Sequence, residues 1–312
     1  MTLLADAPPP DNRIVPIARQ ERPGVGLVNA LSVDVEDYFQ VEAFKSVVDR
    51  TSWDHHPARV AENTARLLDL FASADARATF FVLGWVAERF PAIVQRIKAH
   101  GHEIASHGYA HELAHAQTRN EFRADVRRAR SMLEDLSGDR VRGFRAPTFS
   151  IGGANWWAYE ILAEEGYEYS SSVYPISHDL YGMPGAPRGP FRPMDGHAFL
   201  EIPVATVRLF NKNRPCGGGG WFRLLPYEVS RWCIRRVNRI DGMPCVFYCH
   251  PWEIDVEQPR LSQASLKSRF RHYVNIGAME RRIARLLRDF AWGRIDEIYL
   301  GSCATRTRER NN

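Results

Sequence analysis

The sequence predicts an α/β protein in which helices cover a parallel sheet, arranged either as a barrel or as an open sheet. Short apolar, β-rich runs alternate along the chain with segments whose apolar residues recur at helical spacing. This alternation favours a parallel sheet because parallel strands need a crossover, usually a helix, between them. Four groups of chemically capable residues also follow predicted strands directly. Parallel α/β folds collect their active sites at that end of the strands.

The first half of the chain carries the clearest pattern. We expect strands at residues 27–35, 78–82, 103–106, 141–145 and 167–173. We expect helices at residues 58–71, 91–99, 119–136 and 156–165. Pro91 suits the first turn of its helix, and Gly138 is a typical stop at the end of the next one.

The second half is less regular. Pro- and Gly-rich loops between residues 184 and 213 surround one apolar run at 200–210. Four consecutive glycines, Gly217–Gly220, predict a loop that is either mobile or closely packed. We then expect a helix at 226–240, a strand at 245–249, a long helix near 265–291 and a last strand at 295–300.

Composition and charge exclude several classes of protein. Hydrophobic residues make up 45% of the chain and charged residues 25%, which is usual for a soluble globular protein. The formal net charge is only +4, and Lys and Arg are scattered along the chain, so nothing argues for a nucleic-acid partner. Scattered solvated charge is also a simpler interpretation than attraction to acidic glycans or membrane surfaces. No apolar run approaches the roughly 20 residues that a membrane span requires.

The beginning of the chain and the cysteines give further indications. Residues 1–26 contain no uninterrupted apolar stretch, so we expect a flexible leader rather than a secretory signal, and a cytoplasmic protein. Five cysteines without regular spacing argue against a disulfide framework and favour buried thiols. The length of 312 residues permits one large domain or two small ones, and nothing indicates an oligomeric state.

An acidic cluster follows the first predicted strand. Asp34, Glu36 and Asp37 lie within four residues of one another, where their charges repel unless a cation or shifted pKa values relieve them. Asp34 and Glu36 share one face of the strand. Taken alone, an acidic turn is usually just solvated.

A histidine pair, His107 and His111, follows the third predicted strand. We expect the two residues on a helical turn, because a spacing of four then places both rings on one side, where they can share a metal ion. Together with a carboxylate from the acidic cluster, they predict a site with two His ligands, one carboxylate ligand and open positions for water.

Two more residues end predicted strands. Arg145 is followed closely by Pro147, and it is either the partner of an active-site acid or an ordinary surface Arg. His250 ends an apolar strand and precedes Pro251 and Trp252, which sets a titratable group beside an apolar wall. For any single histidine, a hydrogen-bonded core position is the default interpretation.

The order of these motifs is more specific than any one of them. Two further stretches, TFFVLG at 79–84 and GHEIASHGY at 101–109, add to this pattern. On these residues the chain, from about 31 to 250, resembles the polysaccharide deacetylase family, the NodB-like carbohydrate esterases. The resemblance implies a distorted (β/α) barrel of about seven parallel strands. It also implies hydrolysis of N-acetyl groups on amino sugars, with an N-acetylated polysaccharide or oligosaccharide as the partner.

Two further stretches, SVDVEDYF at 32–39 and FYCHPWEID at 247–255, resemble one branch of that family. This branch is associated with bacterial exopolysaccharide gene clusters, including exosortase-linked ones. The resemblance implies a single deacetylase domain over 27–312, with an insert and C-terminal extension from about 190.

The resemblance also implies roles. Asp34 matches the general base, Arg145 its partner, His250 the general acid, and His107 and His111 the metal-binding histidines. Val35 stands where the family has its metal carboxylate.

The missing carboxylate must therefore come from a neighbour. Glu36 is preferred because it shares the strand face of Asp34, but a turn after Val35 would bring in Asp37 instead. The ligand types favour Zn²⁺.

Aromatic and apolar residues near the motifs are candidates for a sugar-binding wall: Tyr38, Pro147, Phe149 and Trp252. The chain departs from the family at Thr148, where an aromatic residue often follows the Pro. Two alternatives stay open. One is hydrolysis of another amide, such as a cyclic ureide, without a metal; the other is a catalytically inactive glycan-binding subunit.

Overall fold

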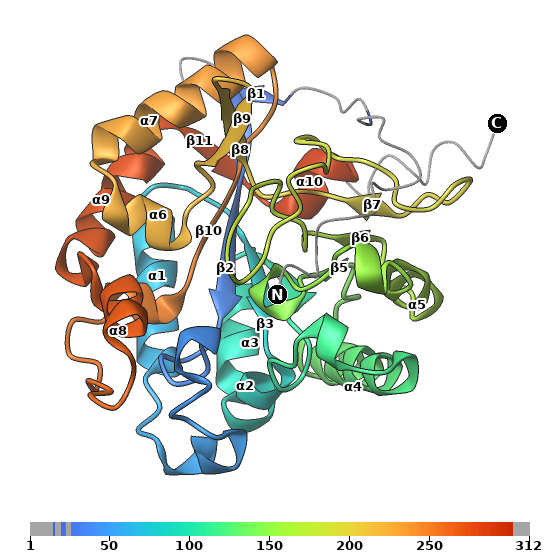
Figure 1. The fold of residues 1–312 in the computed structure, drawn as a ribbon, viewed down its shortest axis with the longest axis vertical. Helices are drawn as coiled ribbons and strands as arrows, with labels where there is room; N and C mark the ends of the chain where they lie inside the picture. Colours follow the sequence, from blue (N-terminus) through green and yellow to red (C-terminus); the bar gives the residue numbers. More distant parts are fainter. Residues whose placement is uncertain (1–14, 16–19, 23–25, 302–312) are drawn as a thin grey trace.

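The computed structural model describes residues 15, 20–22 and 26–301. Within them, seven parallel strands form one curled sheet in the order β10-β2-β3-β4-β5-β6-β7 (Figure 1). Their bounds are β2 (Gly26–Val35), β3 (Thr79–Val82), β4 (Glu103–Ser106), β5 (Gly143–Phe144), β6 (Tyr169–Ser170), β7 (Leu200–Glu201) and β10 (Val246–Cys249). The expected barrel of about seven parallel strands is thus confirmed, in the form of a half-barrel.

Two short strands extend the sheet along β2. β11 (Ala291–Gly293) pairs with β2 in parallel, and β1 (Glu21–Arg22) pairs with its start in antiparallel orientation. Most of the segment expected to be a leader lies outside the described residues. No helix in the described part of the chain is long and apolar enough to cross a membrane.

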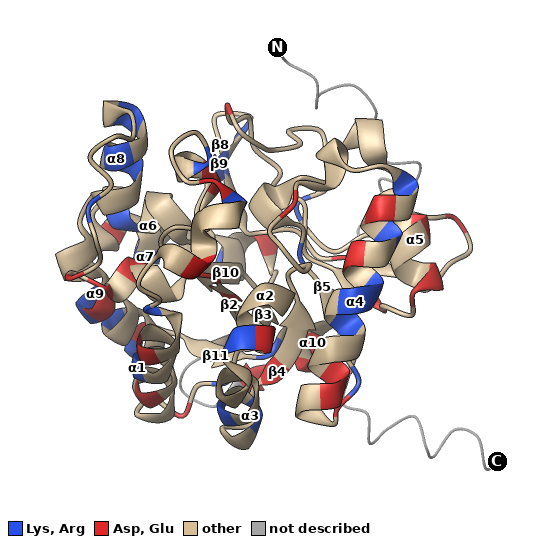
Figure 2. Ribbon diagram, turned by 90° about the horizontal axis from the view of Figure 1, so that it is seen from below, with Lys and Arg blue, Asp and Glu red and all other residues tan. Residues whose placement is uncertain are grey.

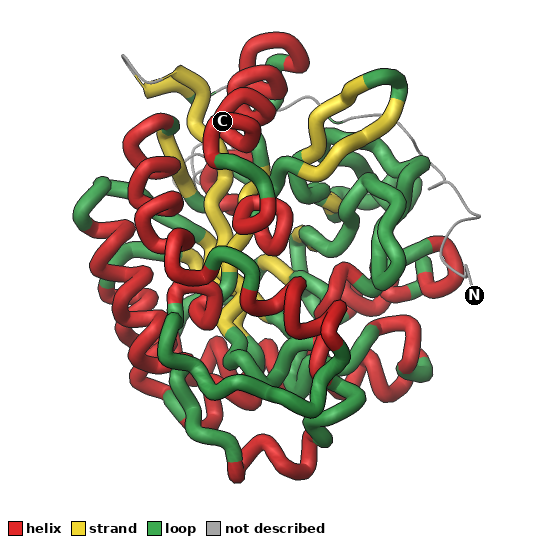
Figure 3. Tube along the Cα trace, turned by 60° about the vertical axis from the view of Figure 1, so that its left-hand side comes forward, coloured by secondary structure: helices red, strands yellow, loops and turns green. Residues whose placement is uncertain are grey.

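Helices cover the outer face of the sheet, and its parallel strands lie in the interior (Figure 3). These are α1 (Val60–Ala72), α2 (Gly84–Arg89), α3 (Pro91–Ala99), α4 (Arg119–Ser137) and α5 (Ala158–Glu164). α4 begins with a capping box between Thr118 and Glu121 and ends at Gly138, whose φ is 68°. Lys and Arg alternate with Asp and Glu on its outer side, as expected for a helix facing solvent (Figure 2).

Residues 202–205 close the gap between β7 and β10 without forming a strand. The amide of Val204 donates to the carbonyl of Val173 at 3.0 Å, and the amide of Ala205 donates to the carbonyl of Val246 at 3.1 Å. On this side, isolated hydrogen bonds rather than a ladder of strand pairs therefore connect residues 202–205 to the segments on either side of them. All the described parallel strands still direct their carboxyl ends toward the same edge of the sheet.

The four-glycine loop lies against β10. The amide of Tyr248 donates to the carbonyl of Gly217 at 2.8 Å. At Gly218, φ is +112°, and an added Cβ atom would lie 2.0 Å from the carbonyl oxygen of Tyr248. Only glycine permits this approach. Of the two expectations for this loop, close packing is confirmed.

The remaining elements lie after β7. They are β8 (Thr206–Leu209), β9 (Lys212–Pro215), α6 (Gly219–Leu224), α7 (Tyr227–Arg236) with a π-helical end at Val237–Asp241, α8 (Leu266–Tyr273), α9 (Ile276–Asp289) and α10 (Ile295–Tyr299).

The expectation of one long helix near 265–291 is wrong. Asn275, with φ at 52°, separates α8 from α9. The buried Arg223 donates to the carbonyls of His272 and Val274 at this break. Those carbonyls are therefore satisfied by a side chain from far away in the sequence, which helical periodicity cannot reveal.

The expectation of a last strand at 295–300 is also wrong, because this segment is helix α10. Its buried residues Ile295, Ile298 and Tyr299 follow a helical spacing of three and four. The amide of Ile295 donates to Thr79 Oγ1 at 2.9 Å, so a side chain of β3 satisfies the start of the helix.

Candidate metal centre and active site

Five of the predicted site residues meet in one groove at the carboxyl ends of the strands: Asp34, Glu36, His107, His111 and His250. They reach it from the end of β2, the loop after β4 and the end of β10. The parallel topology explains this meeting, because segments far apart in sequence end at the same edge.

Glu36, His107 and His111 form a compact buried triad. One candidate ligand atom from each lies within 4.8 Å of the others. His111 Nε2 is 2.9 Å from Glu36 Oε2. This contact does not have the geometry of a hydrogen bond, and Glu36 Oε2 has no hydrogen-bond partner among the described residues. His107 Nδ1 donates to the carbonyl of Arg145 at 2.8 Å, which leaves Nε2 as the metal-binding nitrogen. The donor set and the unsatisfied carboxylate oxygen fit a divalent metal ion.

The two histidines are not on a helix, contrary to the expectation from their spacing. They lie in an irregular loop after β4, in which φ is positive at Gly108 (73°) and at His111 (53°). The rings are 5.5 Å apart between centroids and inclined to each other by 69°. The loop, rather than a helical turn, brings them together.

Charge distribution within the triad suits a cation. Burial alone would raise the pKa of Glu36, but the adjacent His111, followed by His250 and His107, lowers it to about 2. Burial lowers the pKa of His107 to about 4, so this ring is neutral at pH 7 as a metal ligand must be.

Asp37 lies outside the triad and serves the fold. Its carboxylate accepts from the amides of Tyr38 at 2.9 Å, Arg59 at 2.6 Å and Val60 at 2.8 Å. The last two amides begin α1, so Asp37 caps that helix. Between the two carboxylates that the sequence left open, the geometry therefore favours Glu36.

Asp34 is paired with Arg145, as the resemblance implied. Arg145 Nη1 donates to Asp34 Oδ1 at 2.7 Å and to Ser32 Oγ at 2.9 Å. Its other side donates to the carbonyl and the hydroxyl of Ser171. Arg145 is completely buried, and these four hydrogen bonds hold it in one orientation.

His250 faces the two acids of β2. Its Nε2 lies 3.6 Å from Glu36 Oε1 and 3.9 Å from Asp34 Oδ2, and its Nδ1 lies 3.4 Å from Glu253 Oε2. Burial lowers the pKa of His250, but the contact and charge of Glu253, together with Glu36 and Asp34, raise it to about 9. The imidazole is therefore protonated at neutral pH.

Sequence reasoning missed Glu253 and Arg223, which support His250. Glu253 is completely buried, accepts from the amide of His250 at 3.0 Å and receives Arg223 Nε at 2.8 Å. Glu253 follows His250 by three residues, a spacing that signals a cap. Nothing local to Arg223 signals its role, because its partners lie some 30 and 50 residues away.

The predicted sugar-binding residues divide into two groups. Phe149 and Trp252 line the groove, and Trp252 Nε1 donates to Glu36 Oε1 at 3.2 Å. Tyr38 is completely buried in the core and Pro147 is also buried, and neither of them lines the groove.

The opposite wall of the groove was not anticipated. Apolar and aromatic residues from the second half of the chain form it: Leu180, Tyr181, Trp221, Leu224, Tyr248 and Phe270. All but Tyr248, which lies on β10 within the stretch 247–255, come from loops and helices whose sequences carry no motif, so only the fold assembles them.

Thr148 and Phe149 both have positive φ, at 54° and 50°. Two adjacent non-glycine residues in this region are strained, and such strain clusters at functional sites. Thr148 is the second residue of the 3₁₀ turn Pro147–Phe149. The first amides of a helical turn have no acceptor within the turn, so the turn itself does not satisfy the amide of Thr148.

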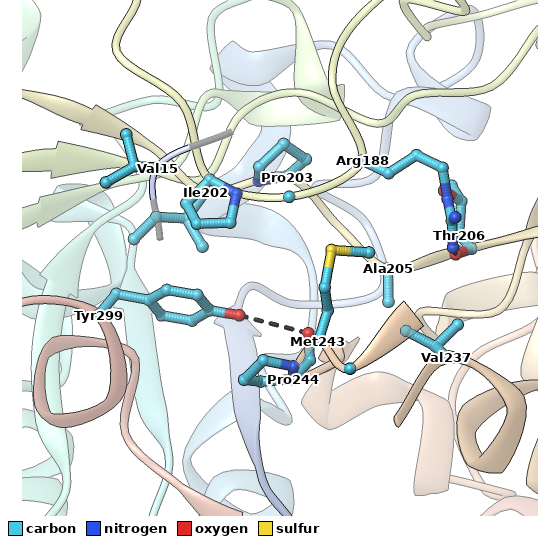
Figure 4. Close-up of a pocket in the computed structure, with 13 residues that line it drawn as sticks. Val15, Arg188, Ile202, Pro203, Ala205, Thr206, Val237, Met243, Pro244 and Tyr299 are labelled. Atoms are coloured by element: carbon cyan, nitrogen blue, oxygen red, sulfur yellow. Dashed lines mark hydrogen bonds between the residues drawn. The ribbon is translucent and has the colours of Figure 1, made fainter. Parts of the chain in front are cut away.

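A second pocket lies away from these residues (Figure 4). Its lining is mainly apolar and includes Ile202, Met243 and Tyr299. The charged residue in its lining, Arg188, is paired with Asp241. The chemically capable residues therefore gather in the groove rather than here.

Fold and site together define an α/β protein with a buried Glu-His-His triad that fits a metal ion, next to Asp34 and His250. Residues 49–169 match the family model for polysaccharide deacetylases, and residues 171–300 match a domain of unknown function (DUF3473). The match to the polysaccharide deacetylase family thus covers the part of the chain from β3 to β6, together with the helices between these strands. His107, His111 and Arg145 lie in the first matched region and His250 in the second, whereas Asp34 precedes both.

Curated relatives agree over part of their length. The chain is 36% identical over 86 residues to a peptidoglycan-N-acetylglucosamine deacetylase of Bacillus cereus, covering 28% of the chain and 31% of the relative. It is 31% identical over 113 residues to a peptidoglycan deacetylase of Helicobacter pylori, covering 35% and 36%. The match thus spans about a third of each relative.

One solved structure matches almost completely. It is a candidate polysaccharide deacetylase from Mycobacterium smegmatis, with a TM-score of 0.58 and 21% identity, over 95% of this chain and 96% of that one. This likeness supports the fold, including the strands and helices after residue 170.

Proposed function

We propose that the protein is a metal-dependent hydrolase that removes N-acetyl groups from amino sugars of a polysaccharide, and that this polysaccharide is an exopolysaccharide or its precursor. The observation that carries the proposal is the buried Glu36–His107–His111 triad beside Asp34 and His250 in one groove. The family match over residues 49–169 supports the reaction class.

The metal ion is proposed to be Zn²⁺, held by Glu36, His107 and His111. When bound there, it supplies a Lewis acid that polarises the acetyl carbonyl and acidifies water. The chain supplies the rest. Asp34 accepts a proton from the attacking water, and its hydrogen bond from Arg145 keeps one carboxylate oxygen oriented while the other faces the groove.

His250 acts as the general acid that protonates the amine as it leaves. It holds a proton at neutral pH because Glu253, Glu36 and Asp34 surround it with negative charge. Asp34 and His250 thus provide a base and an acid in one site, which amide hydrolysis requires. The amide of Thr148 is suited to donate to the developing oxyanion.

The shape of the groove supports a sugar polymer as the substrate. Trp252, Trp221 and Phe270 line a groove that is open rather than enclosed, and aromatic faces suit the apolar faces of sugar rings. The exopolysaccharide assignment rests on the resemblance of the stretches 32–39 and 247–255 to one branch of the family.

The test is acetate release from N-acetylglucosamine oligomers by metal-free protein, with and without added Zn²⁺. We expect zinc-dependent release that falls about 10²- to 10⁴-fold in Asp34→Asn, with metal binding retained. His107→Ala should lose both metal and activity. Activity that survives a strong chelator would favour hydrolysis of a ureide, and a folded protein inactive with every metal would favour a glycan-binding subunit.

A further inference from the structure

The outer side of α7 is unusually apolar for a surface helix. Val229 is 40% exposed, Trp232 50% and Ile240, in the π-helical end, 67%. They follow one another at intervals of three and eight residues, so they lie along one face. Nothing in the described chain covers this face.

The β8–β9 hairpin lies beside α7 and adds a fourth apolar group (Figure 1). Phe210, at the turn of the hairpin, is 95% exposed and has φ at 49°. A phenylalanine this exposed has no role in the core. An exposed aromatic at a hairpin tip is instead typical of a group that enters another phase or partner.

Cations surround these apolar side chains. Five of them are Lys212 and Arg214, which share the face of the hairpin that carries Val207 and Leu209, and Arg235, Arg236 and Arg239 on α7 with its π-helical end. None of the five forms an ion pair with an acid in the part of the chain that the structure describes, whereas Arg231 of α7 is paired with Asp289. We call these five cations and the four apolar residues the basic–aromatic surface.

Many arginines elsewhere are paired with acids. On α4, for example, Arg123 and Arg127 are both paired with Glu165. The acids nearest to the basic–aromatic surface are already used, because Glu228 pairs with Arg285 and Asp241 pairs with Arg188. Among the described residues, the surface therefore keeps positive charge that no acid pairs with, next to exposed apolar side chains.

We propose that the basic–aromatic surface binds the surface of an anionic lipid bilayer. Lys and Arg are attracted to acidic headgroups, while Phe210, Trp232 and Ile240 enter the boundary between headgroups and acyl chains. An acidic polysaccharide would satisfy the cations, but it offers no apolar phase for these side chains. The combination of both features favours a lipid surface over a soluble polyanion.

The test is co-sedimentation of the full chain with vesicles of phosphatidylcholine alone or with about one third phosphatidylglycerol. We expect binding to the anionic vesicles, weakened by salt. Lys212→Gln combined with Arg214→Gln should weaken it about tenfold or more. Phe210→Ser combined with Ile240→Ser should weaken it by a similar factor, because the apolar contribution is lost.

Matched controls come from exposed residues elsewhere. Arg96→Gln with Arg281→Gln removes two exposed cations, and Val256→Ser with Leu266→Ser removes two exposed apolar groups. Both controls should bind vesicles as the unaltered chain does, and circular dichroism should show that every variant is folded.

Three outcomes would overturn the proposal. One is no difference between the two kinds of vesicle. Another is binding that the surface variants and the controls weaken equally. The third is binding to polygalacturonate that is tighter than to vesicles and insensitive to Phe210→Ser with Ile240→Ser, which would assign the surface to a soluble polyanion.

Discussion

Two buried glutamates at opposite ends of the sheet have opposite protonation behaviour. Glu36 lies at the carboxyl end of β2, and its pKa is lowered to about 2. Glu103 lies at the amino end of β4, and its pKa is raised to about 8 by burial and then by the charge of Asp296. Burial favours the neutral form at both places, so their neighbours make the difference.

The neighbours of the two glutamates favour different protonation states. Glu36 faces His107, His111 and His250, which stabilise the ionised carboxylate, the form that binds a cation. Glu103 instead accepts from Thr79 Oγ1 at 2.5 Å and from the hydroxyl of Tyr169 at 2.9 Å. A shifted pKa therefore does not by itself mark an active site, because a structural network also produces one.

The largest expected effect that tests this comparison is that of Glu36→Gln. The variant removes one ligand from the triad, so metal binding should be lost and acetate release should fall by about 10³-fold or more. Metal content and acetate release measure both. Asp37→Asn is the matched control: it should keep the metal and lower the free energy of unfolding by about 1–2 kcal/mol, because α1 loses part of its cap. The reverse pattern would make Asp37 the ligand.

A smaller effect is expected for Glu253→Gln. Its negative charge helps to raise the pKa of His250, so the neutral variant should lower that pKa from about 9. The alkaline limb of the rate profile, where His250 loses its proton, should then move to lower pH. The value of kcat should fall about 10- to 100-fold, with metal content unchanged.

Glu257→Gln is the control for this variant, since its side chain is 82% exposed in the same region. It should leave kcat and the alkaline limb where they are. A fall in kcat for Glu253→Gln without any movement of the alkaline limb would mean that Glu253 only maintains the local fold.

The smallest effect on activity, within about twofold, is expected for Glu103→Gln, because Glu103 lies at the far end of the strands. Its effect is on stability. The folded pKa of about 8 exceeds the usual 4.5. The stability from the bound proton is thus complete below pH about 4.5 and is lost as pH rises through 8.

Gln carries no such proton. The stability of Glu103→Gln relative to the unaltered chain should therefore improve between pH 5 and pH 9, by about 4 kcal/mol. Denaturant unfolding at both pH values measures it, and Glu62→Gln on the exposed side of α1 should show no such trend. A large loss of activity in Glu103→Gln would contradict the view that the carboxyl ends of the strands serve the reaction and the amino ends serve stability.

Local patterns predicted much of the fold. α3 matches its expected bounds, α4 extends one residue further, and β2, β3 and β4 differ by at most one residue. These elements have their apolar spacing, caps and stops in adjacent sequence. The break at Asn275 and the helix α10 were missed because Arg223 and Thr79 satisfy their backbone groups from a distance.

The candidate site shows the same division. The residue types and their order along the chain indicated Asp34, His107, His111, Arg145 and His250, and strand alternation favoured Glu36. The spacing of the two histidines suggested a helix where there is a loop, because a spacing of four does not specify the backbone between them.

By itself, then, the sequence determined which chemical groups are available and that the ends of parallel strands would bring them together. Tertiary structure decided that Glu36 joins the histidines while Asp37 caps α1, and that Arg223 and Glu253 support His250. It also placed the β8–β9 hairpin beside α7, so that cations from both lie near the same exposed apolar side chains. The physical reason is that periodicity and caps act within a few residues, whereas ligand geometry, buried ion pairs and surface charge depend on segments that only folding makes neighbours.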